Sequence, residues 1–433
     1  MEEILAQAKK VAEAAEVFMV SSEETPVQFE ANRLKRIQGK QGTSVALRII
    51  KEGRIGYAAT TDLGDIRGLV NSAAETAPFG TQARFELPTK AKYPRIDVFD
   101  PATESVLIEK MIELGEELIA LITRHTPDII CEAMVSKDIA SLQLINSRGG
   151  EVNYKKSVFS LSLWGSLIRG TDMLFVGESQ SSCNPITTPH EVADVVIQQL
   201  ELAKNRASAP TKQLPVILTP RGVVSAIIPS LTTAFNGKIV LQGASPIGNR
   251  LGQKVFDSKL SLWDDPTIAY RPNSRPCDDE GIPSQRTPLI EQGIVANFFY
   301  DLQTAALAGT KSTGNGSRDG GLPTSSPTTL VIAPGKTSFD EMVSDIKEGL
   351  IIEQLMGAEQ GNILGGDFSG NVLLGYKVEN GKIVGRVKDT MASGNVYQIL
   401  KQITAIGSEA RWVGGFLKAP PLYCPSVAVA SKG

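Results

Sequence analysis

The 433-residue sequence contains only two histidines, His125 and His190, and this scarcity limits the metal and acid–base chemistry available to it. Its four cysteines are scattered along the chain, so they do not form the spacing pattern of a disulfide framework. We therefore expect free thiols and a cytoplasmic location.

Long apolar segments and an excess of positive charge are also missing. No run of eighteen or more apolar residues occurs, so the sequence predicts no transmembrane helix. The net charge is -3, which gives no sign of the basic surface typical of nucleic-acid-binding proteins. The first residues lack the pattern of a signal peptide. These features predict a protein that binds neither nucleic acid nor a membrane.

The first half of the sequence alternates helix and strand patterns. Helices are predicted over residues 2–15 and 64–77, and a third begins at Asp100, which can cap it, and Pro101. Its apolar residues recur at three- and four-residue spacing, namely Leu107, Met111, Leu114, Leu118 and Leu121. A fourth helix is predicted over 189–204.

Strand patterns lie between these helices. Residues 43–50 and 54–61 flank Lys51-Glu52-Gly53 and predict a tight hairpin. Residues 140–168 alternate apolar and polar side chains on either side of Arg148-Gly149-Gly150, which predicts two antiparallel strands. Residues 172–179 predict a further strand.

The second half is richer in Gly, Pro, Ser and Thr and has short strand-like runs. The fold class predicted from this division is α+β. We expect a mixed α/β N-terminal domain over residues 1–205, a polar linker over 206–215, and a β-rich C-terminal domain over 216–433.

Three adjacent acids, Asp278, Asp279 and Glu280, directly follow Cys277. In an extended segment their side chains point alternately to opposite sides, so at most two could bind one ion. No His-x-x-x-His or Cys-x-x-Cys pattern elsewhere completes a zinc site. The local prediction is an acidic turn, with Pro283 fixing the bend.

Both histidines have structural interpretations. His190 and Glu191 match half of a His-Glu-x-x-His zinc helix, but the second ligand position is Asp194. The segment instead predicts a helix start, with Thr188 as cap and Glu191 completing a capping box. His125 lies where the third helix ends, and a cation there complements the helix dipole.

The segment GTKSTGNGSRDGG, residues 309–321, is the most glycine-rich loop. It lacks the spacing of a P-loop, and no Gly-x-Ser-x-Gly motif occurs in the sequence. Arg318 could bind a peptide carboxylate, or it could pair with Asp319 or the acidic turn and join two loops. The candidate substrate-binding residues are Asp279, Glu280, Asn315 and Arg318.

Four blocks of the C-terminal half together resemble the TldD/PmbA family, also called modulator of DNA gyrase. The blocks are DDEGIPSQRTPLIEQGIVANFFYD, STGNGSRDG, APGKTSFDEMV and LIIEQLMGAEQGNILGGDFSGNVLLGYKVENGKIVGRVKDTMASGN. Their order and spacing make the match specific, and a looser resemblance extends over the N-terminal half. The acidic turn belongs to this pattern whether or not a family member binds metal.

The resemblance is to the PmbA (TldE) branch of the family. TldD subunits carry a His-Glu-x-x-x-His helix and a C-terminal cysteine that bind zinc, whereas PmbA subunits lack this set and pair with TldD. The matching segment here, TPRGVVSAIIPSLTTAFNGKIV, has no histidine or acid, and Pro229 interrupts it. Cys424 lies too late in the sequence to match the TldD cysteine.

The resemblance implies a subunit with no catalytic residues and no metal of its own. Zinc would be held by a TldD-like partner, and the complex would degrade unfolded peptides in the cytoplasm. Two alternatives stay open. The chain could be a metallopeptidase with atypical ligands drawn from His125, His190, Cys277 or the acids, or a homodimeric peptide-binding protein without protease activity.

Overall fold

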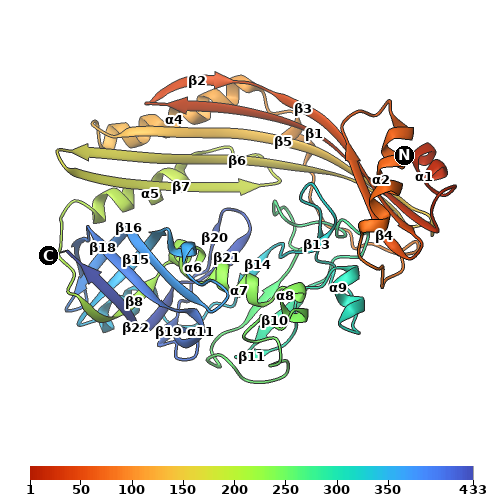
Figure 1. Ribbon diagram of the computed structural model, residues 1–433. Coiled ribbons are helices and arrows are strands. Elements are labelled where there is room, and N and C mark those ends of the chain that lie inside the picture. The colour runs from red at the N-terminus through yellow and green to blue at the C-terminus, as the bar shows by residue number, and fades with distance from the viewer. Residues whose placement is uncertain (433) are drawn as a thin grey trace.

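A computed structural model describes residues 1–432, and its N-terminal half forms one antiparallel sheet that arches over the C-terminal half (Figure 1). The strand order is β4-β3-β1-β5-β6-β7, and β2 pairs with β1. The elements are α1 (Glu2–Ala8), β1 (Ala14–Glu30), β2 (Arg33–Ile37), β3 (Lys40–Lys51), β4 (Arg54–Thr60), α2 (Ile66–Thr76), η1 (Ala77–Phe79), α3 (Pro101–Glu104), α4 (Ile108–His125), β5 (Ile130–Asn146), β6 (Glu151–Arg169), β7 (Asp172–Ser182) and α5 (His190–Leu202).

Helices cover only one face of this sheet. Because side chains alternate along a strand, every second residue faces these helices. Val17 and Leu47 pack with α1 and α2, and Val135 and Leu163 pack with α4 and α5. We call this the helix face and the opposite side the open face.

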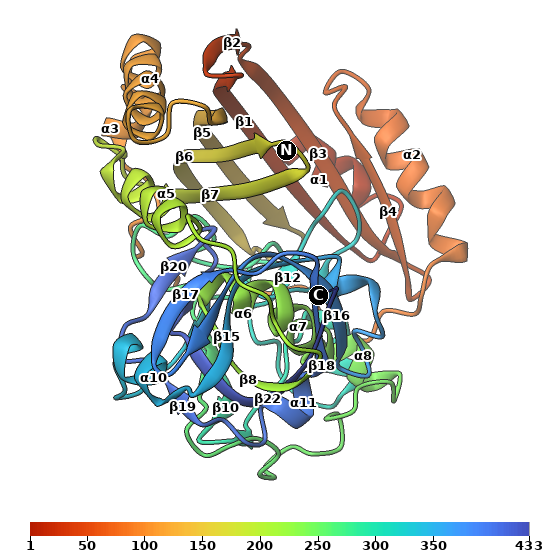
Figure 2. The ribbon, with the colours of Figure 1, turned by 90° about the vertical axis from the view of Figure 1, so that its left-hand side faces the viewer.

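Five strands of the C-terminal half close into a barrel. They pair in the order β15-β8-β22-β18-β16, and β16 pairs again with β15. Figure 2 shows α6 and α7 within this ring of strands. The elements are β8 (Lys212–Leu218), α6 (Pro220–Ala226), α7 (Ile228–Ala234), α10 (Phe339–Asp345), β15 (Glu348–Met356), η2 (Ala358–Gln360), β16 (Asp367–Glu379), β17 (Lys382–Arg386), β18 (Thr390–Asn395), α11 (Val396–Ile399), β19 (Ala405–Ile406) and β22 (Leu422–Ser431).

A second sheet and a pair of short strands lie beside the barrel. The sheet order is β11-β10-β9-β14-β21-β20, and β12 pairs with β13. The elements are α8 (Gly237–Leu241), β9 (Leu262–Asp264), β10 (Thr287–Glu291), β11 (Ile294–Val295), α9 (Leu302–Leu307), β12 (Gly316–Ser317), β13 (Thr324–Ser325), β14 (Leu330–Ile332), β20 (Arg411–Val413) and β21 (Leu417–Ala419). The predicted α+β fold class is confirmed.

Several predicted elements occur as the sequence indicates. The β3–β4 hairpin turns at Glu52 and Gly53, whose φ angles are 52° and 72°. Strands β5 and β6 turn at Gly149, which has a φ of 81°. Helix α2 lies within the predicted range. None of the helices in residues 1–432 has the length and apolar character needed to cross a membrane.

Two predicted helices were wrong in extent. The first ends at Ala8 and not at residue 15, because Ala15 is buried and pairs with Ile49 in the sheet. The third is divided into α3 and α4. Asp100 caps only α3, and the segment before α3 is tied to β6 through a hydrogen bond from the Ser157 amide to the Val98 carbonyl. Leu107, predicted to lie in the apolar stripe, is 68% exposed.

The start of α5 and the linker also differ from prediction. The Thr188 hydroxyl lies 2.6 Å from Nδ1 of His190 and accepts only a long hydrogen bond, 3.5 Å, from the His190 amide, while Pro189 occupies the N-cap position. Glu191 accepts a hydrogen bond from Gln180 of the adjacent β7, so no capping box forms. Strand β8 begins at Lys212, inside the predicted linker, because it pairs there with β22.

Candidate functional site

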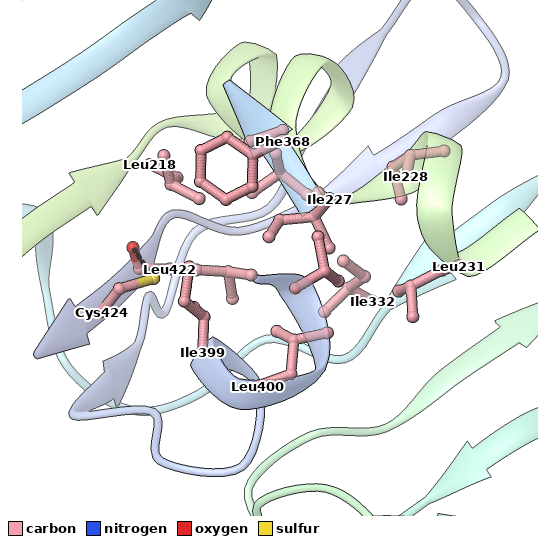
Figure 3. Packing of buried hydrophobic residues seen from close by; sticks show 14 of the residues in the cluster. Leu218, Ile227, Ile228, Leu231, Ile332, Phe368, Ile399, Leu400, Leu422 and Cys424 are labelled. Carbon is pink, nitrogen blue, oxygen red and sulfur yellow. Dashed lines mark hydrogen bonds between the residues drawn. The ribbon is translucent and has the colours of Figure 1, made fainter. Parts of the chain in front are cut away.

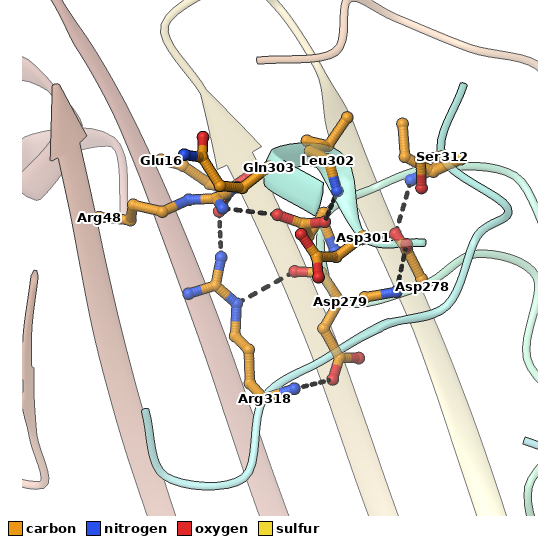
Figure 4. A network of polar contacts seen from close by, with 12 residues as sticks. Glu16, Arg48, Asp278, Asp279, Asp301, Leu302, Gln303, Ser312 and Arg318 are labelled. Carbon is orange, nitrogen blue, oxygen red and sulfur yellow. Dashed lines mark hydrogen bonds and ion pairs between the residues drawn. The ribbon is translucent and has the colours of Figure 1, made fainter. Parts of the chain in front are cut away.

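A buried network of charges joins the open face of the N-terminal sheet to the acidic turn (Figure 4). Arg48 on β3 lies 3.0 Å from a carboxylate oxygen of Glu16 and donates to Oε1 of Glu280 at 2.5 Å. Arg318 pairs with the same carboxylate of Glu16. All four side chains are at most 4% exposed.

The three adjacent acids of the turn have three separate sets of partners. Asp278 accepts hydrogen bonds from the amides of Glu280, Ile282 and Gly316. Burial, together with the neighbouring Glu280, raises the pKa of Asp278 to about 7. Asp279 instead accepts from the Arg318 amide at 2.8 Å. The acids therefore form a turn that is fastened to its surroundings, as the sequence predicted.

Asn315 belongs to a second buried group of polar side chains. Its Nδ2 donates to Asp264 at 2.7 Å and to the Ser326 carbonyl at 3.0 Å. The Thr313 hydroxyl donates to its Oδ1 at 2.7 Å. All the polar atoms of the Asn315 side chain are thus engaged within the chain.

The structure brings the four candidate substrate-binding residues into one region between the two halves. Asp279, Glu280 and Arg318 share the network with the sheet, and Asn315 lies in the same loop as Arg318. For Arg318, the geometry supports the loop-joining alternative, although its charged partner is Glu16 and not Asp319. A role for these four residues in substrate binding stays a prediction.

Replacing Arg318 with alanine should lower the free energy of unfolding by about 1.5–3 kcal/mol, the range for hydrogen bonds to charged groups. Glu16 keeps its pairing with Arg48, which limits the loss. Chemical denaturation of the isolated chain measures the change. Exposed Arg33 on β2 provides the control, because Arg33→Ala should be nearly neutral. Unchanged stability in Arg318→Ala would contradict the loop-joining role.

Lys156 on β6 allows a test of how the stability of the folded chain depends on pH. Burial lowers its pKa from 10.5 to about 8. Because the folded-state pKa lies below the unfolded one, the unfolded chain binds more protons between about pH 8 and 10.5, and this lysine makes stability rise with pH over that window. Lys156→Met should remove that rise and increase stability at pH 7.

The adjacent Lys155, whose side chain is 54% exposed, provides the matched control for this prediction. Melting temperatures of wild type, Lys156→Met and Lys155→Met are compared from pH 7 to 10. Lys155→Met should follow the wild-type curve. Parallel curves for all three proteins would show that Lys156 does not have the lowered pKa on which this prediction rests.

The segment that the family resemblance aligns with the TldD zinc helix is a broken helix within the barrel (Figure 2). Helix α6 ends at Ala226, and α7 starts at Ile228 with Pro229 in its first turn. Residues 219–240 include no histidine, cysteine, aspartate or glutamate. Figure 3 shows its apolar side chains in the barrel core, with Ile227, Ile228 and Leu231 near Leu218, Ile332, Phe368, Ile399, Leu400 and Leu422.

Other possible zinc ligands do not gather elsewhere in the described chain. Within residues 1–432, no group of three His, Cys, Asp or Glu side chains is placed to hold one metal ion. Burial raises the pKa of the Cys424 thiol to about 12. His125 lies 2.5 Å from Glu201, whereas His190 contacts Thr188. These residues do not fit the zinc site that the TldD branch implies.

A cavity of about 850 Å³ lies between the β7 edge of the sheet and the barrel. Its walls come from β7, α5, the start of α6, β15 and β20. It contains Glu178, Arg221 and Glu353, none of which the sequence singled out. Each is an isolated charged residue in an ordinary helix or strand pattern, so no local signal distinguishes it. This cavity is the candidate functional site of the chain.

Two models of one known protein family match this chain. Residues 211–431 match the PmbA/TldA metallopeptidase C-terminal domain, and residues 15–77 match domain 1 of the same family. The first of these matches spans just over half of the sequence. The chain belongs to the TldD/PmbA family.

Related proteins match along nearly the whole chain. An uncharacterized protein of Methanocaldococcus jannaschii is 27% identical, with 93% of each chain covered. The metalloprotease PmbA homolog of Haemophilus influenzae is 23% identical, covering 93% of this chain and 89% of its own length. The crystal structure of TldE from Thermococcus kodakarensis shares the fold, with a TM-score of 0.90, 22% identity and complete coverage of both chains.

Proposed function

We propose that this TldD/PmbA-family chain is a PmbA/TldE-like subunit, without zinc of its own, of a cytoplasmic TldD/TldE-type metalloprotease complex that acts on unfolded peptides. The observation that carries the proposal is the broken α6–α7 segment. A protease zinc site needs three protein ligands and a base for its water, and residues 219–240 supply none of them. Their apolar side chains fill the barrel core instead.

An apolar patch on the open face supports the partner role. It lies at the β7 end of the sheet and consists of six side chains that are each at least 36% exposed: Ile130, Met134, Trp164, Ile168, Met173 and Phe175. Strand pairing brings them together, since Ile168 is opposite Met173 and Phe175 is opposite Ser166, which in turn pairs with Ile130. Gathered apolar side chains of this kind mark interaction surfaces.

The first experiment measures metal and activity in the isolated chain. We expect no stoichiometric zinc by elemental analysis and no cleavage of an unstructured peptide. When a TldD-type subunit from the same source is added, cleavage should appear with zinc bound to that partner. One equivalent of zinc in the isolated chain, together with chelator-sensitive cleavage, would favour a metallopeptidase with atypical ligands and overturn the proposal.

The second experiment tests the partner surface by co-purification and light scattering. The wild-type chain should form a complex with the TldD-type subunit, and Trp164→Glu should weaken it. Phe79→Glu is the control, because Phe79 is 91% exposed and lies outside the patch. A chain that dimerises with itself and ignores the TldD-type subunit would support the homodimeric alternative instead.

A further inference from the structure

Part of strand β6 has no neighbouring strand on one of its two sides. Its pairing with β5 runs from Glu151 to Ser166, whereas its pairing with β7 starts only at Phe159. A strand edge without a neighbour presents backbone N–H and C=O groups to which another chain can bind. We call residues 151–158, on the side away from β5, the β6 edge.

The free backbone groups of the β6 edge belong to Asn153 and Lys155. Successive residues of a paired strand direct their backbone groups alternately to opposite sides. The Ser157 amide donates to the carbonyl of Val98, outside β5, at 3.0 Å, so the residues two and four positions earlier also face away from β5. Within residues 1–432, no hydrogen bond engages the amide or carbonyl of Asn153 or Lys155 on that side.

The segment of residues 88–98 runs alongside the β6 edge without pairing with it. One end is fixed near the β5–β6 turn, where the Asn146 side chain donates to the Pro88 carbonyl at 2.8 Å. The other end is fixed by the bond between Val98 and Ser157. Between these two attachments, no backbone hydrogen bond within residues 1–432 joins the segment to β6. The segment therefore leaves a space beside the strand.

This space is a groove of about 560 Å³, a volume within the range of about 300–1,000 Å³ typical of ligand pockets. Residues 93–99 and Pro276 line one side of it, and residues 151–155 line the other. Its charged residues balance, because Arg95 and Lys155 face Asp97 and Glu151 across the same groove. No net charge selects a ligand here, and the distinctive feature is the unpaired backbone of β6.

We propose that this groove binds a single extended peptide segment, which pairs with the β6 edge as an added strand. Asn153 and Lys155 together present two N–H donors and two C=O acceptors. Two alternate residues of an antiparallel extended chain supply the matching acceptors and donors. Because these contacts involve only backbone atoms, they suit peptides of many sequences.

The groove favours an isolated extended chain over the edge strand of a folded protein. An edge strand has a neighbour of its own about 4.8 Å away on its other side. In the groove that position is taken by residues 93–99, whose segment is attached at both ends. The inference deepens the proposed function and rests on it for the substrate class, since unfolded peptides are extended chains of this kind.

Fluorescence anisotropy of the isolated full chain tests the inference with two labelled peptides of one sequence. The first is fluorescein-Gly-Lys-Thr-Val-Thr-Val-Thr-Lys-amide. The second is N-methylated at the central Val-Thr-Val, which removes backbone donors but keeps every side chain. We expect the methylated peptide to bind about tenfold more weakly or worse, because no two alternate amides near its centre can still donate.

Proline variants locate the binding on β6. Lys155→Pro removes an amide that faces the groove, and proline is tolerated at strand edges where no hydrogen bond is lost. Lys155→Ala is the matched control, because it removes the same side chain and keeps the amide. Lys155→Pro should bind the unmethylated peptide several-fold more weakly than Lys155→Ala, and Asn153→Pro should differ from Asn153→Ala in the same direction. Circular dichroism and melting temperatures check that all four variants fold.

Equal affinity for the two peptides, equal affinity of each folded proline variant and its alanine control, or no binding at millimolar peptide would each overturn the inference. The methylated peptide requires no variant, so it decides the question even if the proline variants unfold. A chain that supports cleavage with a TldD-type subunit but fails these binding tests defeats only this inference. A chain that passes them but forms no complex with that subunit defeats only the proposed function.

Discussion

Replacing Arg48 with alanine should lower the free energy of unfolding by about 3–5 kcal/mol, the range for breaking a buried ion pair. Arg48 is 3% exposed and is the cation between Glu16 and Glu280, with its guanidinium 4.8 Å from the centre of the Phe85 ring. Its loss leaves Glu280 buried without a paired cation. Because Glu280 belongs to the acidic turn, the two halves of the molecule should also separate more easily.

Chemical denaturation of the isolated chain measures this effect. The exposed Lys35–Glu30 pair provides the control, and Lys35→Ala should cost less than about 1 kcal/mol. Combining Arg48→Ala with Glu280→Gln should recover part of the lost stability, since the second change removes the uncompensated charge. A loss below 1 kcal/mol for Arg48→Ala alone would contradict the account of the network.

Asp264→Ala should also be strongly destabilising, by about 3–5 kcal/mol. The Asp264 carboxylate is 1% exposed and accepts hydrogen bonds from the Asn315 amide, the Thr328 amide and hydroxyl, and the Thr329 amide. Each buried donor left without a partner costs about 1–3 kcal/mol, and partial relaxation reduces the sum. The glycine-rich loop should lose its attachment to β9 at the same time.

The neighbouring aspartate supplies the matched control for this second prediction. Among the described residues, the Asp265 carboxylate accepts hydrogen bonds only from Thr267, so Asp265→Ala should cost about 1 kcal/mol. Melting temperatures and denaturant titrations compare both variants with wild type. If Asp264→Ala keeps its stability but loses binding of an unfolded peptide, the loop around Asn315 has a functional role that its internal contacts do not explain.

The helices and strands that could be predicted are those whose sequence pattern involves only residues close together in the chain. The β3–β4 hairpin and α2 have periodic apolar residues and turn residues at the right places, and they occur as expected. The first and third helices were wrong in extent because tertiary contacts prevailed: Ala15 joins the sheet, and the segment before α3 is tied to β6. The order of motifs in the second half carried the family assignment.

The candidate site was harder to predict because its members are far apart in the sequence. Glu178, Arg221 and Glu353 come from β7, α6 and β15, and each looks like an ordinary surface charge in its own segment. Similarly, the pairing of Arg318 with Glu16 spans 302 positions, and the sequence suggested only Asp319 and the acidic turn as charged partners for that arginine. Long-range pairing of this kind leaves no local pattern.

The closure of the barrel by β8 and β22 has a consequence for how the protein is made. Residues 212–218 leave the ribosome long before residues 422–431, yet the two strands are hydrogen-bonded neighbours. Until β22 is synthesised, β8 and β18 each lack a neighbour and present unpaired backbone groups, which are templates for association between nascent chains. Non-local pairing of this kind is slow to form. The newly made C-terminal half should therefore depend on chaperones more than the N-terminal sheet, whose last strand ends at Ser182.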